Sequence, residues 1–186
     1  MADLLVPKQM FFTKGVGKHR HNLQSFEEAL RHAGIAAFNL VRVSSIFPPG
    51  CKIVSRERGL EQLRAGGIVH CVMAESRTNE PNRLVCAGIG LAVPRKKKNT
   101  DHGYIAEHHG YGLTTRKCGD LVEDMAATML ATTQGIELNP DKAYDERREI
   151  YQAKGLVINT RAHVQTAEGD KNGLWTTVMA AAVLIC

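Results

Sequence analysis

The feature that most restricts the fold is an apolar run near the end of the sequence, from Val178 to Ile185. A strand with apolar side chains on both faces must be covered on both faces, so it belongs at the centre of a sheet and not at an edge. The run therefore predicts a sheet in which the C-terminal segment is a central strand.

Apolar patterns elsewhere indicate further strands. The candidates are residues 9–14, 38–44, 67–76, 84–93, 103–109, 156–167 and 174–186. The segments 67–76 and 84–93 flank a turn-rich stretch, so they are expected to form a buried hairpin.

Two helices are also expected. The first is predicted to begin at Ser25, with Glu28 completing a capping box, and to stop at Gly34. The second carries a broad apolar stripe from about Thr115 to Gln134, and Gly135 fits its C-terminal cap. Strands outnumber helices, and each helix can cover only part of a sheet. We therefore predict an α/β sandwich of mainly antiparallel sheet with packed helices, in which residues 1–186 form a single domain.

Charge and composition restrict the functional classes. The 24 Lys and Arg residues exceed the 19 Asp and Glu residues by five, a mild basic excess that suits nucleic acid without requiring it. No apolar run approaches the roughly 18 residues that span a bilayer, and the start lacks the order of a signal peptide, so we expect a cytoplasmic protein with no membrane partner. The five cysteines form no C-x-x-C pair and are expected to be free thiols.

The most unusual chemistry lies where two hydroxyl side chains end a strand close to two prolines. Pro48 and Pro49 cannot donate to a sheet ladder, so the strand must end or turn sharply at Ser44 and Ser45. Backbone strain stored there would be relieved if the Ser45 hydroxyl attacked the Ser44 carbonyl. Asn39 is a candidate to polarise that carbonyl during such processing. The plain alternative is a polar strand end without chemistry.

Seven segments spread from Phe11 to Val183 form a combined pattern that composition does not easily generate. They are FFTKGVG, SFEEALRHAGI, FNLVRVSSIFPPGCKIVSRERGL, NEPNRLVCAGIGLAVP, GYIAEHHGYG, EDMAATMLATT and GLWTTVMAAAV. In this pattern the chain resembles the pyruvoyl-dependent arginine decarboxylases. The resemblance implies self-cleavage between Ser44 and Ser45 into chains 1–44 and 45–186, with Ser45 converted to a covalent pyruvoyl group. Neither PLP nor a metal is then needed.

The resemblance also implies the reaction and its residues. L-Arginine would form a Schiff base on the pyruvoyl group and leave as agmatine and CO2, with Glu107 as the proton donor, buried enough to hold a proton near neutral pH. Glu27, twelve residues before Asn39, matches the carboxylate that takes the guanidinium, although some relatives carry Asp there. A homotrimer of cleaved protomers, or a higher assembly of them, would share each site between neighbours. Otherwise Glu107 is a solvated strand carboxylate and Glu27 a first-turn helix acid.

Other functions stay open at this point. The pyruvoyl enzyme could act on another amino acid, or the basic run from Arg95 to Lys98 could mark a nucleic-acid binding module, although a solvated loop explains four charges without aromatics equally well. A thiol or metal hydrolase has candidate residues without a fixed spacing: His19, His21, His108, His109 and a cysteine. Since adjacent strand residues point to opposite faces, His108 and His109 cannot easily chelate one ion, and no metal is expected.

Overall fold

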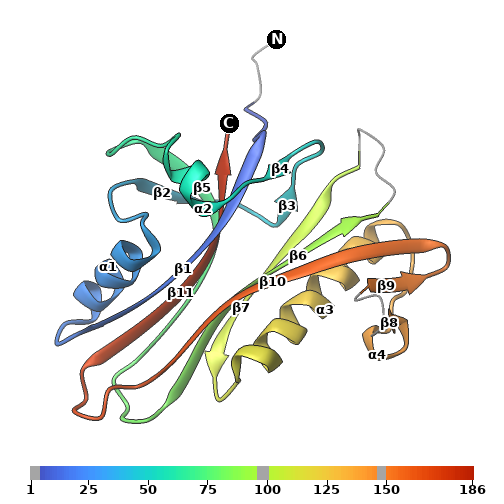
Figure 1. Cartoon of the computed structure of the whole chain (residues 1–186). Coiled ribbons are helices and arrows are strands. Elements are labelled where there is room, and N and C mark those ends of the chain that lie inside the picture. The colour runs from blue at the N-terminus through green and yellow to red at the C-terminus, as the bar shows by residue number, and fades with distance from the viewer. Residues whose placement is uncertain (1–4, 96–100, 146–149) are drawn as a thin grey trace.

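The computed structural model describes residues 5–95, 101–145 and 150–186. Within these residues the strands form two sheets that pack face to face, with a long helix on the outer face of each (Figure 1). Sheet A has five strands, in the order β2 (Asn39–Arg42), β5 (Ile68–Thr78), β11 (Trp175–Ile185), β1 (Gln9–His19) and β4 (Lys52–Ile53). Sheet B has six, in the order β3 (Ile46–Phe47), β7 (Gly103–Tyr111), β6 (Leu84–Pro94), β10 (Leu156–Glu168), β9 (Ile150–Ala153) and β8 (Tyr144–Asp145).

The helices complete the layers. They are α1 (Asn22–Ala33), α2 (Arg56–Leu60), α3 (Thr115–Thr133) and α4 (Pro140–Ala143). Helix α1 packs on sheet A through Ala29 and Ala33, while α3 packs on sheet B through Ala126 and Leu130. The predicted single-domain α/β sandwich of mainly antiparallel sheet is therefore confirmed, as a four-layer α/β/β/α arrangement.

Strand β11 lies at the centre of sheet A, as its composition predicts. It pairs with β1 on one side and β5 on the other, both antiparallel, and every residue from Val178 to Ile185 is buried. Val178, Ala180 and Ala182 join the core between the sheets, whereas the alternate residues face α1. The apolar run is thus explained by burial on both faces of one strand.

Glycines in the strands let the helices approach closely. A Cβ on Gly17 of β1 would come within 2.2 Å of the Ser25 carbonyl oxygen in α1, and one on Gly90 of β6 would come within 2.0 Å of the Val122 carbonyl oxygen in α3. Neither position has room for a side chain. Each helix therefore rests directly on the backbone of the strand beneath it.

Two local predictions are wrong. Strands β5 and β6 do not form a hairpin, since they belong to different sheets and the turn at 79–83 carries the chain from one sheet to the other. The first helix begins three residues earlier than expected, at Asn22, so no capping box forms. Instead, the buried Ser25 hydroxyl donates to the Asn22 carbonyl at 2.7 Å and lies 2.6 Å from the Thr177 hydroxyl of β11. The helix ends, Gly34 and Gly135, are both confirmed by their positive φ.

Candidate functional site

Ser44 and Ser45 lie where the chain crosses between the two sheets. Strand β2 ends at Arg42 on the edge of sheet A, and β3 begins at Ile46 beside β7 on the edge of sheet B (Figure 1). In the single chain Ser44 is exposed and Ser45 half-buried. The buried Phe47 then anchors the segment in the core between the sheets.

Backbone hydrogen bonds fix the crossover on both sides. The Val43 N–H donates to the Cys71 carbonyl of β5 at 3.0 Å, which ends the contact with sheet A. The Ile105 N–H of β7 donates to the Ser45 carbonyl at 2.6 Å, which begins the contact with sheet B. The Ser44–Ser45 peptide is therefore held between two rigid sheets.

A third hydrogen bond acts on the peptide itself. The Ile46 N–H donates to the Ser44 carbonyl oxygen at 3.0 Å and closes a three-residue turn with Ser45 at its centre. A donor on this oxygen polarises the carbonyl toward a nucleophile, and the next residue in the sequence, Ser45, carries a hydroxyl. Neither Ser44 nor Ser45 has a positive φ, so the backbone strain expected there does not take the form of a left-handed conformation.

Glu107 lies near the crossover. It follows Ile105 by two residues on β7, so both side chains are on one face of the strand. Burial raises the pKa of the Cys71 thiol to about 11, while Arg42 lowers it and Glu107 raises it. In the single chain, however, Glu107 is exposed and lacks the predicted burial.

The structure does not bring Asn39 to the Ser44 carbonyl. The Asn39 side chain lies at the start of β2, where its Nδ2 donates to the Gly66 carbonyl at 2.7 Å, and its backbone N–H bonds to Gly67. This arrangement fixes the first residue of the edge strand. Asn39 therefore supports the strand that leads to Ser44.

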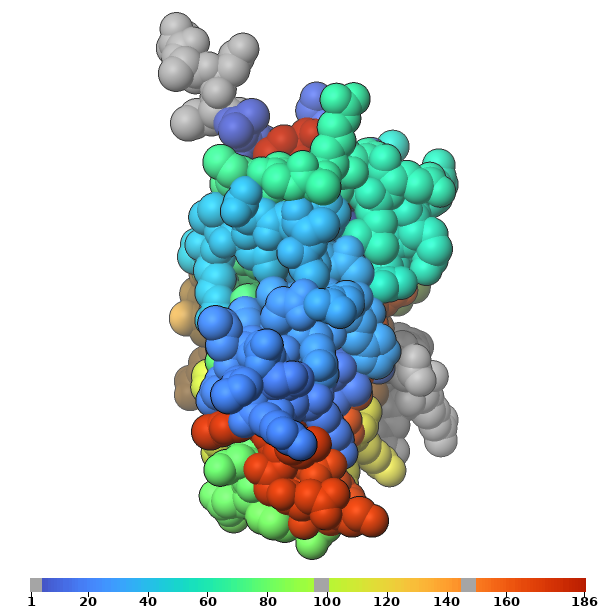
Figure 2. Space-filling model, turned by 90° about the vertical axis from the view of Figure 1, so that its left-hand side faces the viewer, coloured from blue at the N-terminus to red at the C-terminus, as the bar shows by residue number. Residues whose placement is uncertain are grey.

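Glu27 lies on the solvent side of α1, apart from the crossover. Both its carboxylate oxygens accept from Arg31 Nη2, at 2.7 and 2.9 Å, and none of the described contacts joins it to Ser45 or Glu107. Helix α1 and strand β2 are neighbours on the face seen in Figure 2, with a groove of about 430 Å3 between them. Its lining residues are Phe26, Leu30, Phe38, Asn39, Leu40, Arg42, Met73, Glu75 and Arg77.

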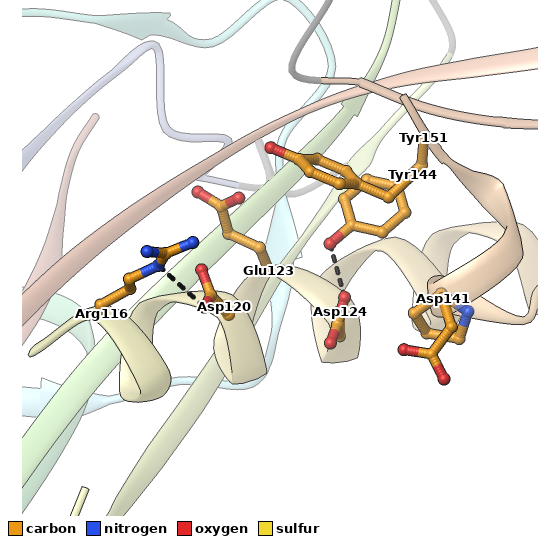
Figure 3. A pocket seen from close by; sticks show the side chains of 8 residues that line it. Arg116, Asp120, Glu123, Asp124, Asp141, Tyr144 and Tyr151 are labelled. Carbon is orange, nitrogen blue, oxygen red and sulfur yellow. Dashed lines mark hydrogen bonds and ion pairs between the residues drawn. The ribbon is translucent and has the colours of Figure 1, made fainter. Parts of the chain in front are cut away.

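A second cavity, of about 560 Å3, is strongly acidic (Figure 3). It is lined by Arg116, Asp120, Glu123, Asp124, Pro140, Asp141, Tyr144 and Tyr151. The Tyr151 hydroxyl donates to Asp124 at 2.5 Å, and burial raises the pKa of Glu123. Because none of its residues comes from β2, β3 or β7, this cavity is separate from the crossover.

The features behind the other functions are weak. In the described parts of the chain, no three His, Cys, Asp or Glu side chains are grouped to hold a metal ion. His19 and His21 are neighbours with ring centroids 5.7 Å apart, and the pKa of His108 is lowered by burial and by His109. The basic residues 96–98 lie outside the described residues. No described helix combines the length and the apolar character needed to cross a membrane.

Sequence reasoning predicts roles for the two serines and Glu107, which stay predictions, and it missed the groups around them. The Ile46 N–H is a backbone donor, and its identity leaves no signal in the sequence. Arg42 and Glu75, which meet beside the crossover at 2.9 Å, are far apart in the chain and look like ordinary surface charges. One feature of the sequence points to Glu75: side chains alternate between the two faces of β5, which puts Glu75 on the same face as Met73.

Comparison with known proteins agrees with the resemblance. The profile of the pyruvoyl-dependent arginine decarboxylase family (PvlArgDC) matches residues 9–186. A probable pyruvoyl-dependent arginine decarboxylase of Chloroherpeton thalassium is 54% identical over 97% of this chain and 98% of the relative. Pyruvoyl-dependent arginine decarboxylase 2 of Methanosarcina acetivorans is 53% identical over 97% of this chain and 98% of the relative. The pyruvoyl-dependent arginine decarboxylase of Methanococcoides burtonii is 52% identical over 97% of this chain and 99% of the relative.

These matches cover nearly the whole chain, including both sheets and the crossover. They confirm the predicted function, a lyase that decarboxylates arginine with a covalent pyruvoyl cofactor and not PLP, and they do not favour the nucleic-acid or hydrolase alternatives. The chain belongs to the pyruvoyl-dependent arginine decarboxylase family.

Proposed function

We propose that the protein cleaves itself between Ser44 and Ser45, that Ser45 becomes its pyruvoyl group, and that the processed enzyme converts L-arginine to agmatine and CO2. One observation carries the assignment of the cleavage site. The Ser44 carbonyl, next to the Ser45 hydroxyl, accepts the Ile46 N–H at the crossover between the sheets. Serine is also the residue that a pyruvoyl group requires, since its hydroxyl is both the nucleophile and the later leaving group.

The proposed self-cleavage needs no reagents other than groups of the chain and water. The Ser45 Oγ adds to the Ser44 carbonyl carbon, and the Ile46 N–H donates to the oxygen on which negative charge develops. The C–N bond then breaks, and the hydroxyl proton ends on the freed amine, which leaves an ester. Loss of the Ser45 α-proton expels residues 1–44 as a carboxylate. The remaining dehydroalanine takes up water and releases ammonia to give the ketone.

Glu107 is the proposed proton donor in the decarboxylation. The pyruvoyl group supplies the electron sink when CO2 leaves. Glu107 lies two residues along β7 from Ile105, whose N–H donates to the carbonyl of Ser45, and this neighbourhood supports the proposal that its carboxyl group holds a proton beside the reacting carbon. Burial by a neighbouring protomer would give the exposed Glu107 the dry surroundings that a proton donor needs near neutral pH.

Glu27 is the proposed partner of the substrate guanidinium. Both carboxylate oxygens of Glu27 accept from Arg31, and a carboxylate can receive the guanidinium of a substrate in the same way. Since Glu27 does not reach Ser45 within one chain, the proposal places it in the site of a neighbouring protomer, where substrate would share or displace Arg31.

The proposed assembly is a homotrimer of cleaved protomers, or a larger assembly of such trimers, in the cytoplasm. Exposed apolar side chains flank the cleavage site on both sides, Val41 on β2 and Ile46 on β3, and Leu23 is exposed one turn before Glu27. Burial of these residues between protomers would remove apolar surface from water and enclose a substrate as long as arginine. The size of the assembly in solution tests this proposal.

Intact mass measurement under denaturing conditions tests the cleavage site. We expect two chains, residues 1–44 and 45–186, the second with a blocked N-terminus, and release of CO2 from arginine. Ser45→Ala removes the attacking hydroxyl and should stay intact and inactive. Ser55→Ala, which alters the cap of α2 and leaves the crossover unchanged, is the control and should be cut normally. An uncut wild-type chain, or a cut elsewhere, would overturn the assignment.

A further inference from the structure

Glu75 of β5 joins two arginines beside the crossover. Its Oε2 lies 2.9 Å from Arg42 Nη2, and its Oε1 accepts from Arg77 Nη2 at 2.8 Å. Arg77 is itself fixed, because its Nη1 donates to Asn22 Oδ1 at 2.5 Å and its guanidinium lies 4.4 Å from the centroid of the Phe26 ring. The Glu75 side chain is 23% exposed, so both ion pairs are partly shielded from solvent. Glu75 thus connects the last residue of β2 to the start of α1.

The ion pair with Arg42 lies on the outer face of sheet A. Arg42 pairs with Cys71 in the parallel ladder, and Cys71 and Met73 pack on the α1 side, so Glu75 lies on the same face. After Arg42 the main chain leaves in the other direction, toward sheet B. The ion pair therefore holds the end of β2 from the face opposite the crossover.

Strand β2 needs such an anchor because its own contacts are few. It has four residues, lies at the edge of sheet A and, among the residues that the structure describes, pairs only with β5. If β2 continued in register, it would run beside Met73 and Ala74 toward Glu75. The Arg42 side chain reaches forward over this stretch, while the backbone turns away at Ser44.

We propose that Glu75 is a positioning residue for self-cleavage: through Arg42 it fixes the end of β2, and so keeps the Ser44 carbonyl on the Ile46 N–H. This inference rests on the proposed cleavage at Ser44–Ser45. Without the ion pair, the end of the short edge strand has more freedom, and fewer chains at any moment hold the carbonyl beside its donor and the Ser45 hydroxyl. Cleavage then slows although the fold persists.

The test follows cleavage of freshly synthesised precursor by intact mass. Glu75→Gln and Arg42→Gln should each slow cleavage about 10-fold or more, and the double variant should be no slower than Glu75→Gln alone, since that substitution already removes the contact with Arg42. Glu75→Asp keeps the charge and should recover part of the rate. Glu80→Gln removes an exposed ion pair with Arg83, in the turn after β5, and is the matched control with wild-type cleavage.

Thermal unfolding in the uncut Ser45→Ala background separates positioning from stability. A merely structural Glu75 would lower the melting temperature without a shared effect with Arg42 on the cleavage rate. Wild-type cleavage rates in Glu75→Gln, or additive losses in the double variant, would overturn the inference. If Glu75→Gln does not fold, Arg42→Gln decides, because the Arg42 side chain is 54% exposed and can be solvated. If the wild-type chain and Glu75→Gln are both cut at the normal rate, the role of Glu75 is refuted and the proposed cleavage site is not.

Discussion

His163 should make the fold sensitive to mild acid. It lies on β10, where its ring stacks on Phe12 of β1 with centroids 5.5 Å apart, and its Nε2 is enclosed without a described hydrogen-bond partner. Burial, followed by the charges of Lys14 and Arg161, lowers its pKa from 6.5 to about 4. Across a cavity of about 290 Å3, α3 presents further charges of both signs: Arg116, Asp120 and Glu123. The neutral ring is therefore the form that fits the folded protein.

The sign and size of the effect follow from proton linkage. Between pH 6.5 and about 4 the unfolded chain binds a proton at His163 and the folded chain does not, so the free energy of unfolding falls as the pH falls. At about 1.4 kcal/mol per pH unit this interval sets a ceiling of about 3 kcal/mol. Because water reaches part of the ring, we expect about 1 to 2 kcal/mol.

Urea unfolding between pH 7.5 and 4.5, in the uncut Ser45→Ala background, measures this loss. His163→Gln has no titrating group there, so its free energy of unfolding should decline less than that of the parent as the solution is acidified. His21→Gln, which changes an exposed histidine before α1, is the control and should follow the parent. If the parent and His163→Gln decline in parallel, the buried neutral histidine is not the cause of acid sensitivity.

Three further substitutions test the site and the fold. Glu107→Gln removes a transferable proton at nearly constant shape, so cleavage should proceed while decarboxylation falls about 100-fold or more; near-normal turnover of the cut variant would make Glu107 a structural carboxylate. Glu27→Gln should leave cleavage intact and raise KM for arginine more than KM for norleucine. An equal rise in both KM values would mean that another acid binds the guanidinium. Gly90→Ala puts a Cβ 2.0 Å from the Val122 carbonyl oxygen and should lower the free energy of unfolding by about 2 kcal/mol or more. Gly119→Ala, whose Cβ would lie 3.5 Å from its nearest neighbour, is the control and should be neutral or stabilising. Equal stabilities of the two variants would contradict this packing.

The sequence predicts which residues form strands better than it predicts which strands pair with one another. Burial on both faces leaves a clear pattern, which is why the central position of β11 could be predicted from Val178 to Ile185. The same pattern cannot say which sheet a strand joins. Residues 67–76 and 84–93 are apolar enough to be neighbours, yet each lies inside a different sheet, and the short turn between them led to the wrong hairpin.

The candidate site shows the same limit. Ser44 and Ser45 could be recognised because two prolines must end the strand and two hydroxyls are available there. The contacts that hold them are long-range or belong to the backbone: Ile105 donates from β7, and Glu75 reaches Arg42 from β5. Within this chain the Asn39 amide donates to the Gly66 carbonyl, so its expected role at the Ser44 carbonyl stays a prediction. Local sequence cannot show where a side chain finds its partner.

The place of the crossover is compatible with the proposed self-cleavage, because a cut there would leave the fold held together. Residues 1–44 supply β1, α1 and β2, and β1 is paired with β11 along its whole length, from Gln9 beside Ile185 to His19 beside Trp175. The proposed cleavage at Ser44–Ser45 would break none of these ladders, because the peptide bond that it cuts joins one sheet to the other and belongs to neither. The new end at Ser45 would stay beside β7 through the Ile105 N–H. The small chain would therefore be held by sheet A itself, and the reactive end by sheet B.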